Sequence, residues 1–473
     1  MNFTSVDYFL FLPVVFLFFY FMNHRYRWLV LLIASYGFYA TFKAPQLLIV
    51  LVLVTVISYF FGVRLGRTSD ERRRKLVFWL GTAGCALILV IMKYLLPLLT
   101  SGSADHHYAR LLLSIGVSYY TFQAISYLAD IYLEIQEPEK HLGYHALYLA
   151  FFPKLLQGPI ERAGDLVPQL KAKYEFHYDN MRSGMLLFTW GLFKKVVVAD
   201  RLALYADYVY NDVHAYVGLP LILATYAYAL QIYYDFAGYT DMARGTARMF
   251  GINLTENFNN PYMAISIADF WRRWHISFSR WLLDYIFMPL QVQFREWKTS
   301  GVVFALMFTF LLCGIWHGAS RTFLVWGGLH GFFMAISVVS QPTREIIRQR
   351  WMPANPRIQK IWQATVTFHL VCFAWIFFRA NSLGDAYYVV THLFSGVDGA
   401  RSFLLAQAKT NLFVAVVSIT VVAVASFLDK EAIAGKKFHE KPLFLRWGTY
   451  YLLVLSILWF AADQQGHFIY FQF

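Results

Sequence analysis

Long uninterrupted runs of apolar residues follow one another along most of this chain. The first three, Tyr8–Met22, Leu47–Val63 and Leu76–Met92, are each long enough, or nearly so, to cross a bilayer as a helix. Similar runs recur near Met185–Val198, Leu219–Tyr234, Val302–Ile315, Phe323–Val339, Trp362–Phe378, Leu412–Leu428 and Tyr450–Ala462. The pattern predicts an all-α polytopic membrane protein with roughly ten to thirteen membrane segments.

Composition supports this prediction and excludes a soluble protein. The 473 residues are 58% hydrophobic and only 15% charged, whereas soluble domains carry about 25% charged residues. The three cysteines, Cys85, Cys313 and Cys372, all lie in apolar runs without metal-ligand spacing. They are expected to be small buried hydrophobes, so the sequence predicts neither a disulfide nor a bound metal.

Positive charge is unevenly distributed along the first part of the chain. The net charge is +13, and basic loops at His24–Arg27 and Val63–Lys75 follow the first and third apolar regions. The positive-inside rule places both loops in the cytoplasm and the N-terminus outside. Anionic lipid headgroups and this topology account for the basic excess, so no nucleic-acid partner is expected.

Polar residues within apolar surroundings are concentrated between residues 114 and 330. Charged groups at membrane depth are costly, and interrupted helices there are tolerated only when buried in protein or lining a cavity. We therefore expect one integral membrane domain over residues 1–473. It would have scaffold helices in 1–100, a catalytic core in 110–340, and C-terminal helices with an aromatic tail in 360–473.

The stretch Asp269–Tyr285 has the pattern of an amphipathic helix lying in the cytoplasmic interface. Its charged residues form two pairs four positions apart, Asp269 with Arg273 and Arg280 with Asp284, which a helix would place on one face. Its tryptophans suit an interfacial position: Trp271, Trp274 and Trp281. Two interpretations of Arg272 and Arg273 stay open. They are snorkelling anchors that meet lipid phosphates, or they hold an anionic substrate.

His317 is the strongest candidate for a catalytic group. It follows an apolar run and therefore falls inside, or at the end of, a membrane helix. Imidazole titrates near neutrality and is the commonest general base. The neighbouring Gly314 and Gly318 would let backbone or substrate approach closely. The alternative is a core histidine bonded to a neighbouring helix. His275 has a weaker claim of the same kind, and His330 suits a packing role.

Several sequence motifs together resemble the membrane-bound O-acyltransferase family. A "WHG" motif is preceded by "FWRRWHISFS", and "YTFQAISYLADIY", "FPKLLQGPI", "YDFAGYTDMA" and "ENFNNPY" also match, in the family's order. The likeness covers most of the chain. It is greatest to the bacterial branch that contains the alginate O-acetylation membrane protein, the D-alanyl transfer protein of teichoic acids and peptidoglycan O-acetylation proteins.

The resemblance implies a ring of tilted helices around a central funnel, with His317 as the catalytic residue at its neck. It also implies a role for His275, which lies in the second histidine motif. In the exopolysaccharide branch the acyl donor is thought to be acetyl-CoA, with extracytoplasmic acyltransferase partners of the SGNH type. In the teichoic-acid branch the donor is a D-alanyl carrier protein. No bound cofactor is implied.

Acyl transfer also needs a group that stabilises the oxyanion and groups that hold the substrate. Asn260 and Gln123 are candidates for the first role. We expect these two residues, together with Trp316, Asp235 and the two arginines, to form the substrate site.

The segment "FIYFQF", residues 468–473, carries one phenol among aromatic rings. A small membrane peptide of the teichoic-acid system has a similar aromatic ending, thought to receive the acyl group on its tyrosine. By this resemblance Tyr470 is a candidate acyl relay, since a phenol with a pKa of about 10 is easier to deprotonate than a sugar hydroxyl. The alternative is an interfacial aromatic belt.

The sequence therefore predicts an enzyme of the bacterial cytoplasmic (inner) membrane that moves acetyl groups from acetyl-CoA toward an extracytoplasmic polysaccharide, either an alginate-like exopolysaccharide or a cell-wall glycan. Transfer of D-alanyl or another acyl group is the alternative within the same class. A transporter or flippase, and a scaffold for an export complex, are alternatives from other classes.

Overall fold

The computed structural model describes residues 1–42, 44–99, 116–351, 355–396, 416–417, 419–421, 438 and 440–462. All regular secondary structure in these ranges is helical, which confirms the expected all-α class. The three cysteines are buried, as the sequence predicted.

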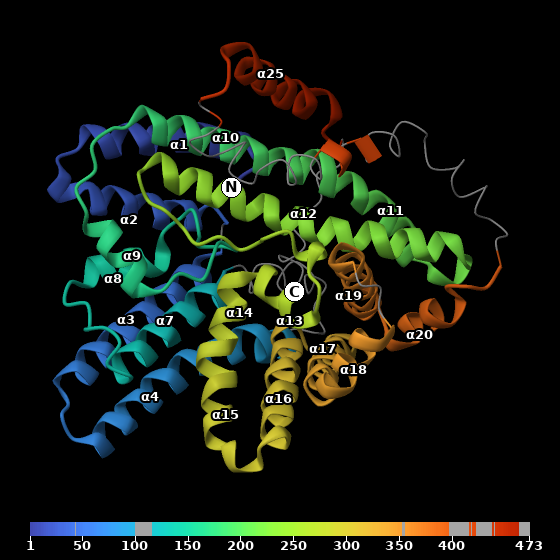
Figure 1. Ribbon diagram of the computed structural model, residues 1–473. Helices are drawn as coiled ribbons and strands as arrows, with labels where there is room; N and C mark the ends of the chain where they lie inside the picture. Colours follow the sequence, from blue (N-terminus) through green and yellow to red (C-terminus); the bar gives the residue numbers. More distant parts are fainter. Residues whose placement is uncertain are drawn as a thin grey trace.

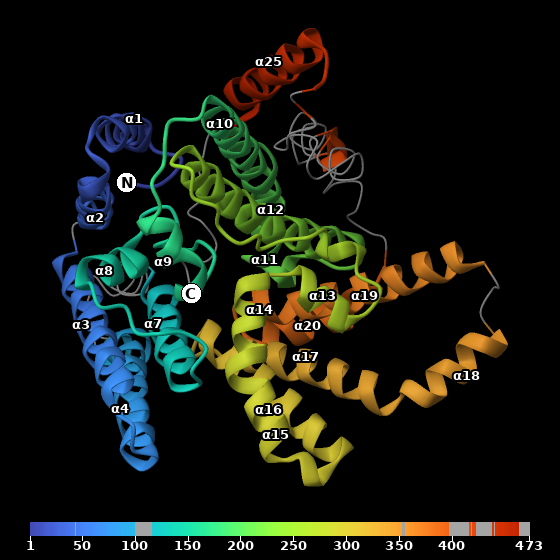
Figure 2. The same cartoon turned by 60° about the vertical axis from the view of Figure 1, so that its left-hand side comes forward.

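The N-terminal helices pack together on one side of the molecule (Figure 2). Polar side chains fix where three of them begin, because Ser5, Asn23 and Asp70 accept hydrogen bonds from backbone N–H groups of the first turn. The elements of this part are α1 (Val6–Phe21), α2 (His24–Ala40), α3 (Pro45–Arg67), α4 (Glu71–Val90), the π-helical η1 (Ile91–Leu95), α5 (Leu96–Leu99), α7 (Val117–Tyr132), α8 (Leu142–Ala150) and α9 (Ala163–Lys171).

Helices from the middle of the chain cross the molecule side by side (Figure 1). These are α10 (Tyr178–Phe193), the π-helical η2 (Lys194–Ala199), α11 (Asp200–Tyr210), the 3₁₀ turn η3 (Val213–Ala215) and α12 (Leu219–Met249). Helix α12 contributes buried side chains to all three hydrophobic clusters, for example Tyr239, Phe236 and Tyr234. It is therefore the element that joins the parts of the core.

Two pairs of glycines allow α10 and α12 to approach closely. A Cβ atom added at Gly184 would lie 2.6 Å from the carbonyl oxygen of Gly245, and one at Gly191 would lie 2.5 Å from that of Gly238. The two glycines of α10 are seven residues apart, and so are the two glycines of α12. The two contacts therefore fall on the same face of each helix. Small residues at such positions permit the backbone contact on which helix packing in membranes depends.

The remaining elements form the other side of the molecule, with α25 packed outside α10 (Figures 1 and 2). They are the 3₁₀ turn η4 (Pro261–Met263), α13 (Ile267–Arg273), α14 (Ile276–Leu282), the π-helical η5 (Leu283–Phe287), α15 (Met288–Gln293), the 3₁₀ turn η6 (Arg295–Trp297), α16 (Thr299–His317), α17 (Arg321–Val339), α18 (Gln341–Trp351), α19 (Pro356–Arg379), α20 (Leu383–His392) and α25 (Leu443–Phe460).

Among the described residues, six helices are long and apolar enough to cross a membrane: Leu47–Arg67, Glu71–Leu95, Thr299–His317, Arg321–Val339, Pro356–Arg379 and Leu443–Phe460. This is fewer than the ten to thirteen expected. The runs at Met185–Val198 and Leu219–Tyr234 do form helices, but their elements are shorter or more polar than a simple span. Most of Leu412–Leu428 lies outside the described residues.

Candidate active site

His317 is the last residue of α16, and close packing of α16 on α17 fixes its position. A Cβ atom at Gly314 would lie 2.4 Å from the carbonyl oxygen of Phe323 and 3.3 Å from the Cα atom of Gly327. The backbones of the two helices therefore touch one turn before His317. This confirms the interpretation of Gly314 as a position of close backbone approach.

Aromatic side chains from three helices enclose the His317 imidazole. Its ring centroid lies 4.5 Å from that of Trp316 and 4.9 Å from those of Trp326 on α17 and Phe378 on α19. The side chain is only 4% exposed. Such surroundings exclude water and limit the rotamers open to the imidazole, as a reacting group requires.

His275 lies at a sharp turn between α13 and α14. Its backbone is left-handed, with φ of 42°, an uncommon conformation for a residue with a side chain. Asn257 holds this turn, because its backbone carbonyl accepts from the Ile276 N–H at 2.9 Å and its side chain accepts from the Ser277 N–H at 3.1 Å. Burial lowers the pKa of His275 to about 3, so the imidazole is neutral. Strained backbone of this kind is common at functional sites.

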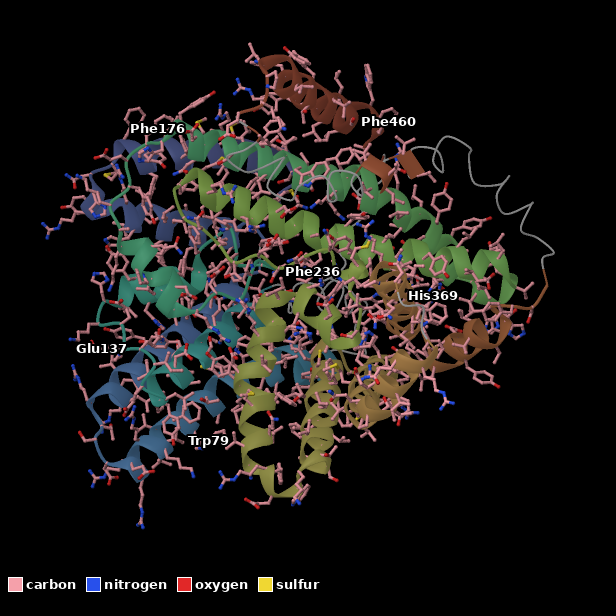
Figure 3. All side chains as sticks on the ribbon, in the orientation of Figure 1. Trp79, Glu137, Phe176, Phe236, His369 and Phe460 are labelled. Atoms are coloured by element: carbon pink, nitrogen blue, oxygen red, sulfur yellow. The ribbon has the colours of Figure 1, made fainter. Side chains whose placement is uncertain are left out.

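The structure brings His275 and His317 into one aromatic cluster. The Phe278 ring lies 5.1 Å from His275 and 4.3 Å from Trp316, the residue next to His317. The Phe236 ring of α12 contacts His275 edge-on at 4.6 Å, and Figure 3 shows it near the middle of the molecule. Two histidines that are distant in sequence thus share one buried region.

The expected single amphipathic helix over Asp269–Tyr285 is wrong in two respects, its continuity and one of its two ion pairs. The turn at His275 divides the segment into α13 and α14. Asp284 pairs with Arg162 at 2.9 Å, not with Arg280, since the π-helical η5 changes the register after α14. Only the predicted pair of Arg273 with Asp269 forms, at 2.9 Å.

The tryptophans of this segment are buried and not interfacial: Trp271, Trp274 and Trp281. They fill the core between α13, α14, α16 and α17, and two of them have internal hydrogen-bond acceptors. The Trp271 indole donates to Nδ1 of His330 at 3.2 Å, and the Trp281 indole donates to the backbone of α7 at 3.0 Å. This arrangement fits the packing role expected for His330.

Two predicted substrate residues already have protein partners. The Gln123 amide donates to the Tyr119 carbonyl at 3.2 Å and accepts from the buried ammonium of Lys154, whose pKa burial lowers. Asp235 accepts from the Lys195 ammonium at 2.6 Å. Both side chains are buried, and their roles toward a substrate stay predictions.

The other predicted substrate residues lie near α13. Asn260 has a left-handed backbone, with φ of 44°, at the start of η4. The backbone N–H of its neighbour Asn259 donates to the Arg273 carbonyl at 2.9 Å. Arg272 is exposed, as a lipid anchor would be. The structure holds these residues next to the segment that carries His275. Tyr470 and the rest of the aromatic tail lie outside the described residues.

Sequence reasoning missed two lysines. Lys93 directly follows the apolar run Leu76–Met92, and Lys195 lies inside the apolar run Met185–Val198. A charged residue at membrane depth was the signal for both. The Lys93 side chain contacts the Trp316 ring.

A family model described as the membrane-bound O-acyltransferase family matches residues 31–381. The chain is 36% identical to a probable alginate O-acetylase from Pseudomonas aeruginosa, over 93% of this chain and 82% of that protein. It is 31% identical to a peptidoglycan O-acetyltransferase from Helicobacter pylori, over 99% of this chain and 97% of that protein. It is 28% identical to a teichoic acid D-alanyltransferase from Bacillus subtilis, over 64% of this chain and 77% of that protein. The transporter, flippase and scaffold alternatives are thereby set aside.

Proposed function

The chain belongs to the membrane-bound O-acyltransferase family, and on that premise we propose that it transfers acetyl from acetyl-CoA toward hydroxyl groups of an extracytoplasmic polysaccharide. The proposed acceptor is an alginate-like exopolysaccharide or a cell-wall glycan. The printed names of two relatives, an alginate O-acetylase and a peptidoglycan O-acetyltransferase, support this substrate class. The proposed location is the bacterial inner membrane.

The observation that carries the proposal is the buried His317 at the end of α16. An imidazole enclosed by aromatic rings is a suitable base for a hydroxyl that has entered a water-poor site. Here His317 takes the proton of the acceptor hydroxyl as its oxygen attacks the thioester carbonyl carbon. When the carbon–sulfur bond breaks, the protonated histidine returns the proton to the departing thiolate.

We assign His275 to a positioning role. Its neutral ring lies in the same aromatic cluster as His317, and its left-handed backbone is fixed by Asn257. A rigid, strained turn of this kind holds neighbouring groups in a reactive geometry. We retain Asn260, Trp316 and Arg272 as groups that hold the substrate.

Transfer of D-alanine is the second candidate, and the similarity to a teichoic acid D-alanyltransferase favours it. The donor distinguishes the two candidates. Purified protein given acetyl-CoA is expected to release free CoA thiol above the uncatalysed background, followed with a thiol reagent. Release from a D-alanyl carrier protein, with none from acetyl-CoA, would overturn the acetyl assignment and retain acyl transfer.

We further propose that the Tyr470 phenol is the hydroxyl that receives the acyl group at the His317 site and carries it to an extracytoplasmic acyltransferase partner of the SGNH type. The Tyr470 phenol would form an ester more reactive than a sugar ester, since a phenol is the more acidic alcohol.

Mass spectrometry of the C-terminal peptide tests this relay. We expect an added acyl mass on Tyr470 in wild-type cells and none in cells that carry His317→Ala. The size of the added mass identifies the acyl group. Tyr470→Phe should abolish polymer acylation. Full acylation in that variant would rule out the relay, and transfer would then be direct.

A further inference from the structure

Lys93 places an amino group inside the membrane region of the protein. It lies in η1, the π-helical end of the apolar span Glu71–Leu95. A lysine at this depth is costly, and such residues are by default candidates for function. π-helical turns inside α-helices are also frequent at functional sites. Both features make Lys93 a candidate functional residue.

The Lys93 side chain lies against the last turn of α16. Its Nζ atom is 5.1 Å from the centroid of the Trp316 ring, and the hydroxyl of the adjacent Tyr94 donates to the Ile315 carbonyl at 2.5 Å. The Trp316 ring is in turn 4.5 Å from His317. The Lys93 ammonium is close enough to His317 for the two groups to interact electrostatically.

The surroundings of Lys93 differ from those of three other lysines that are buried or partly buried. Lys154, Lys194 and Lys195 each donate to a side-chain oxygen. For Lys93, the structure records no side-chain oxygen partner within the described ranges, and its Nζ atom lies over the aromatic face of Trp316. A cation over a ring is stabilised, but its N–H groups need hydrogen-bond acceptors. The charge is therefore available to a negative group that appears beside His317.

We propose that Lys93 is a further catalytic residue, whose ammonium stabilises the oxyanion formed during acyl transfer next to His317. This inference rests on the proposed function of the site. A snorkelling role for Lys93 would direct the ammonium toward lipid headgroups. The contact with Trp316, itself buried beside His317, holds it at the site instead.

The chemical step is an ordinary thioester substitution. The acceptor oxygen forms a bond to the acyl carbon as its proton moves to His317. The electron pair of the carbonyl π bond moves to the carbonyl oxygen, which becomes an oxyanion beside the Lys93 ammonium. When the carbonyl re-forms, the carbon–sulfur bond breaks and the thiolate takes the proton from His317. Lys93 keeps its own protons throughout.

Lys93→Met tests the proposal, because methionine has a similar length and no charge. We expect kcat for CoA release by the purified full-length protein to fall by about 100-fold, as for the loss of one oxyanion-hole donor. KM should change little, since the interaction exists only in the transition state. Lys93→Arg should retain most of the activity. Lys75→Met, at the exposed start of the same span, is the matched control and should behave as wild type.

Restoring a positive charge at position 93 distinguishes a loss of catalysis from a loss of folding. Lys93→Cys should be inactive, and alkylation with 2-bromoethylamine, which rebuilds an ammonium of almost the same length, should recover activity. The native cysteines are buried, and alkylated wild type serves as the reference. If Lys93→Met keeps wild-type kcat while His317→Ala is inactive, the role of Lys93 is refuted and the proposed function stands. If His317→Ala is fully active, the proposed function itself fails.

Discussion

Replacing His317 by alanine is expected to lower the rate of acyl transfer by about a thousandfold. A positioned general base contributes about 10²–10⁴ in rate. The enclosure of the ring by Trp316, Trp326 and Phe378 leaves little room for bulk water to take over its task. The measurement is CoA release by purified protein, together with the acetyl content of the cell-envelope polymer. KM for acetyl-CoA should stay close to wild type.

His145→Ala is the matched control for this loss. His145 is also a fully buried histidine, and it hydrogen-bonds to Ser58 at 2.8 Å within the N-terminal part of the core. Its replacement removes a buried imidazole without touching the proposed site. It is therefore expected to lower thermal stability more than kcat. Equal losses of kcat in both variants would mean that His317 supports the fold and not the chemistry.

Replacing Lys195 by methionine is expected to give the largest loss of stability. The Lys195 ammonium lies 2.7 Å from an Asp200 oxygen and 2.6 Å from an Asp235 oxygen, and all three side chains are almost fully buried. Removing the cation leaves two carboxylates buried without it, and breaking a buried ion pair costs about 3–5 kcal/mol. We expect a markedly lower unfolding temperature in detergent and reduced yield.

The neighbouring lysine provides the comparison for Lys195→Met. Lys194 pairs with Asp241 at 2.7 Å, but both side chains are partly accessible and Arg244 lies 3.5 Å from the same carboxylate. Lys194→Met should therefore cost much less, because Asp241 keeps a cation. Similar losses from both variants would contradict the view that burial decides the cost. The double variant Lys195→Met with Asp235→Asn should recover part of the stability.

The sequence was sufficient to predict the class and the family. Apolar runs identified a helical membrane protein because a helix that crosses lipid must be apolar over its whole length. His317 could be identified as a candidate because a polar group at the end of such a run is costly at membrane depth, which favours a functional role. The prediction that Gly314 permits close backbone approach also followed from local chemistry, and the contact with α17 confirms it.

Pairings between distant residues could not be read from spacing along one helix. Asp284 has Arg280 at the correct spacing, yet a π-helical turn and the approach of Arg162 gave it another partner. The tryptophans of the same segment matched an interfacial pattern, but neighbouring helices bury them. A tryptophan is apolar over most of its surface, so both environments suit it, and packing makes the choice.

The sequence by itself therefore determined that the protein is a helical membrane protein and which polar residues lie in apolar surroundings, and its motifs indicated the family. The tertiary structure alone decided which of those residues meet. It placed His275 in one aromatic cluster with His317, and it brought Lys93 from the end of a separate span against Trp316. The physical reason is that the cost of a polar group in lipid depends on its own segment, whereas its partner depends on how separate helices pack.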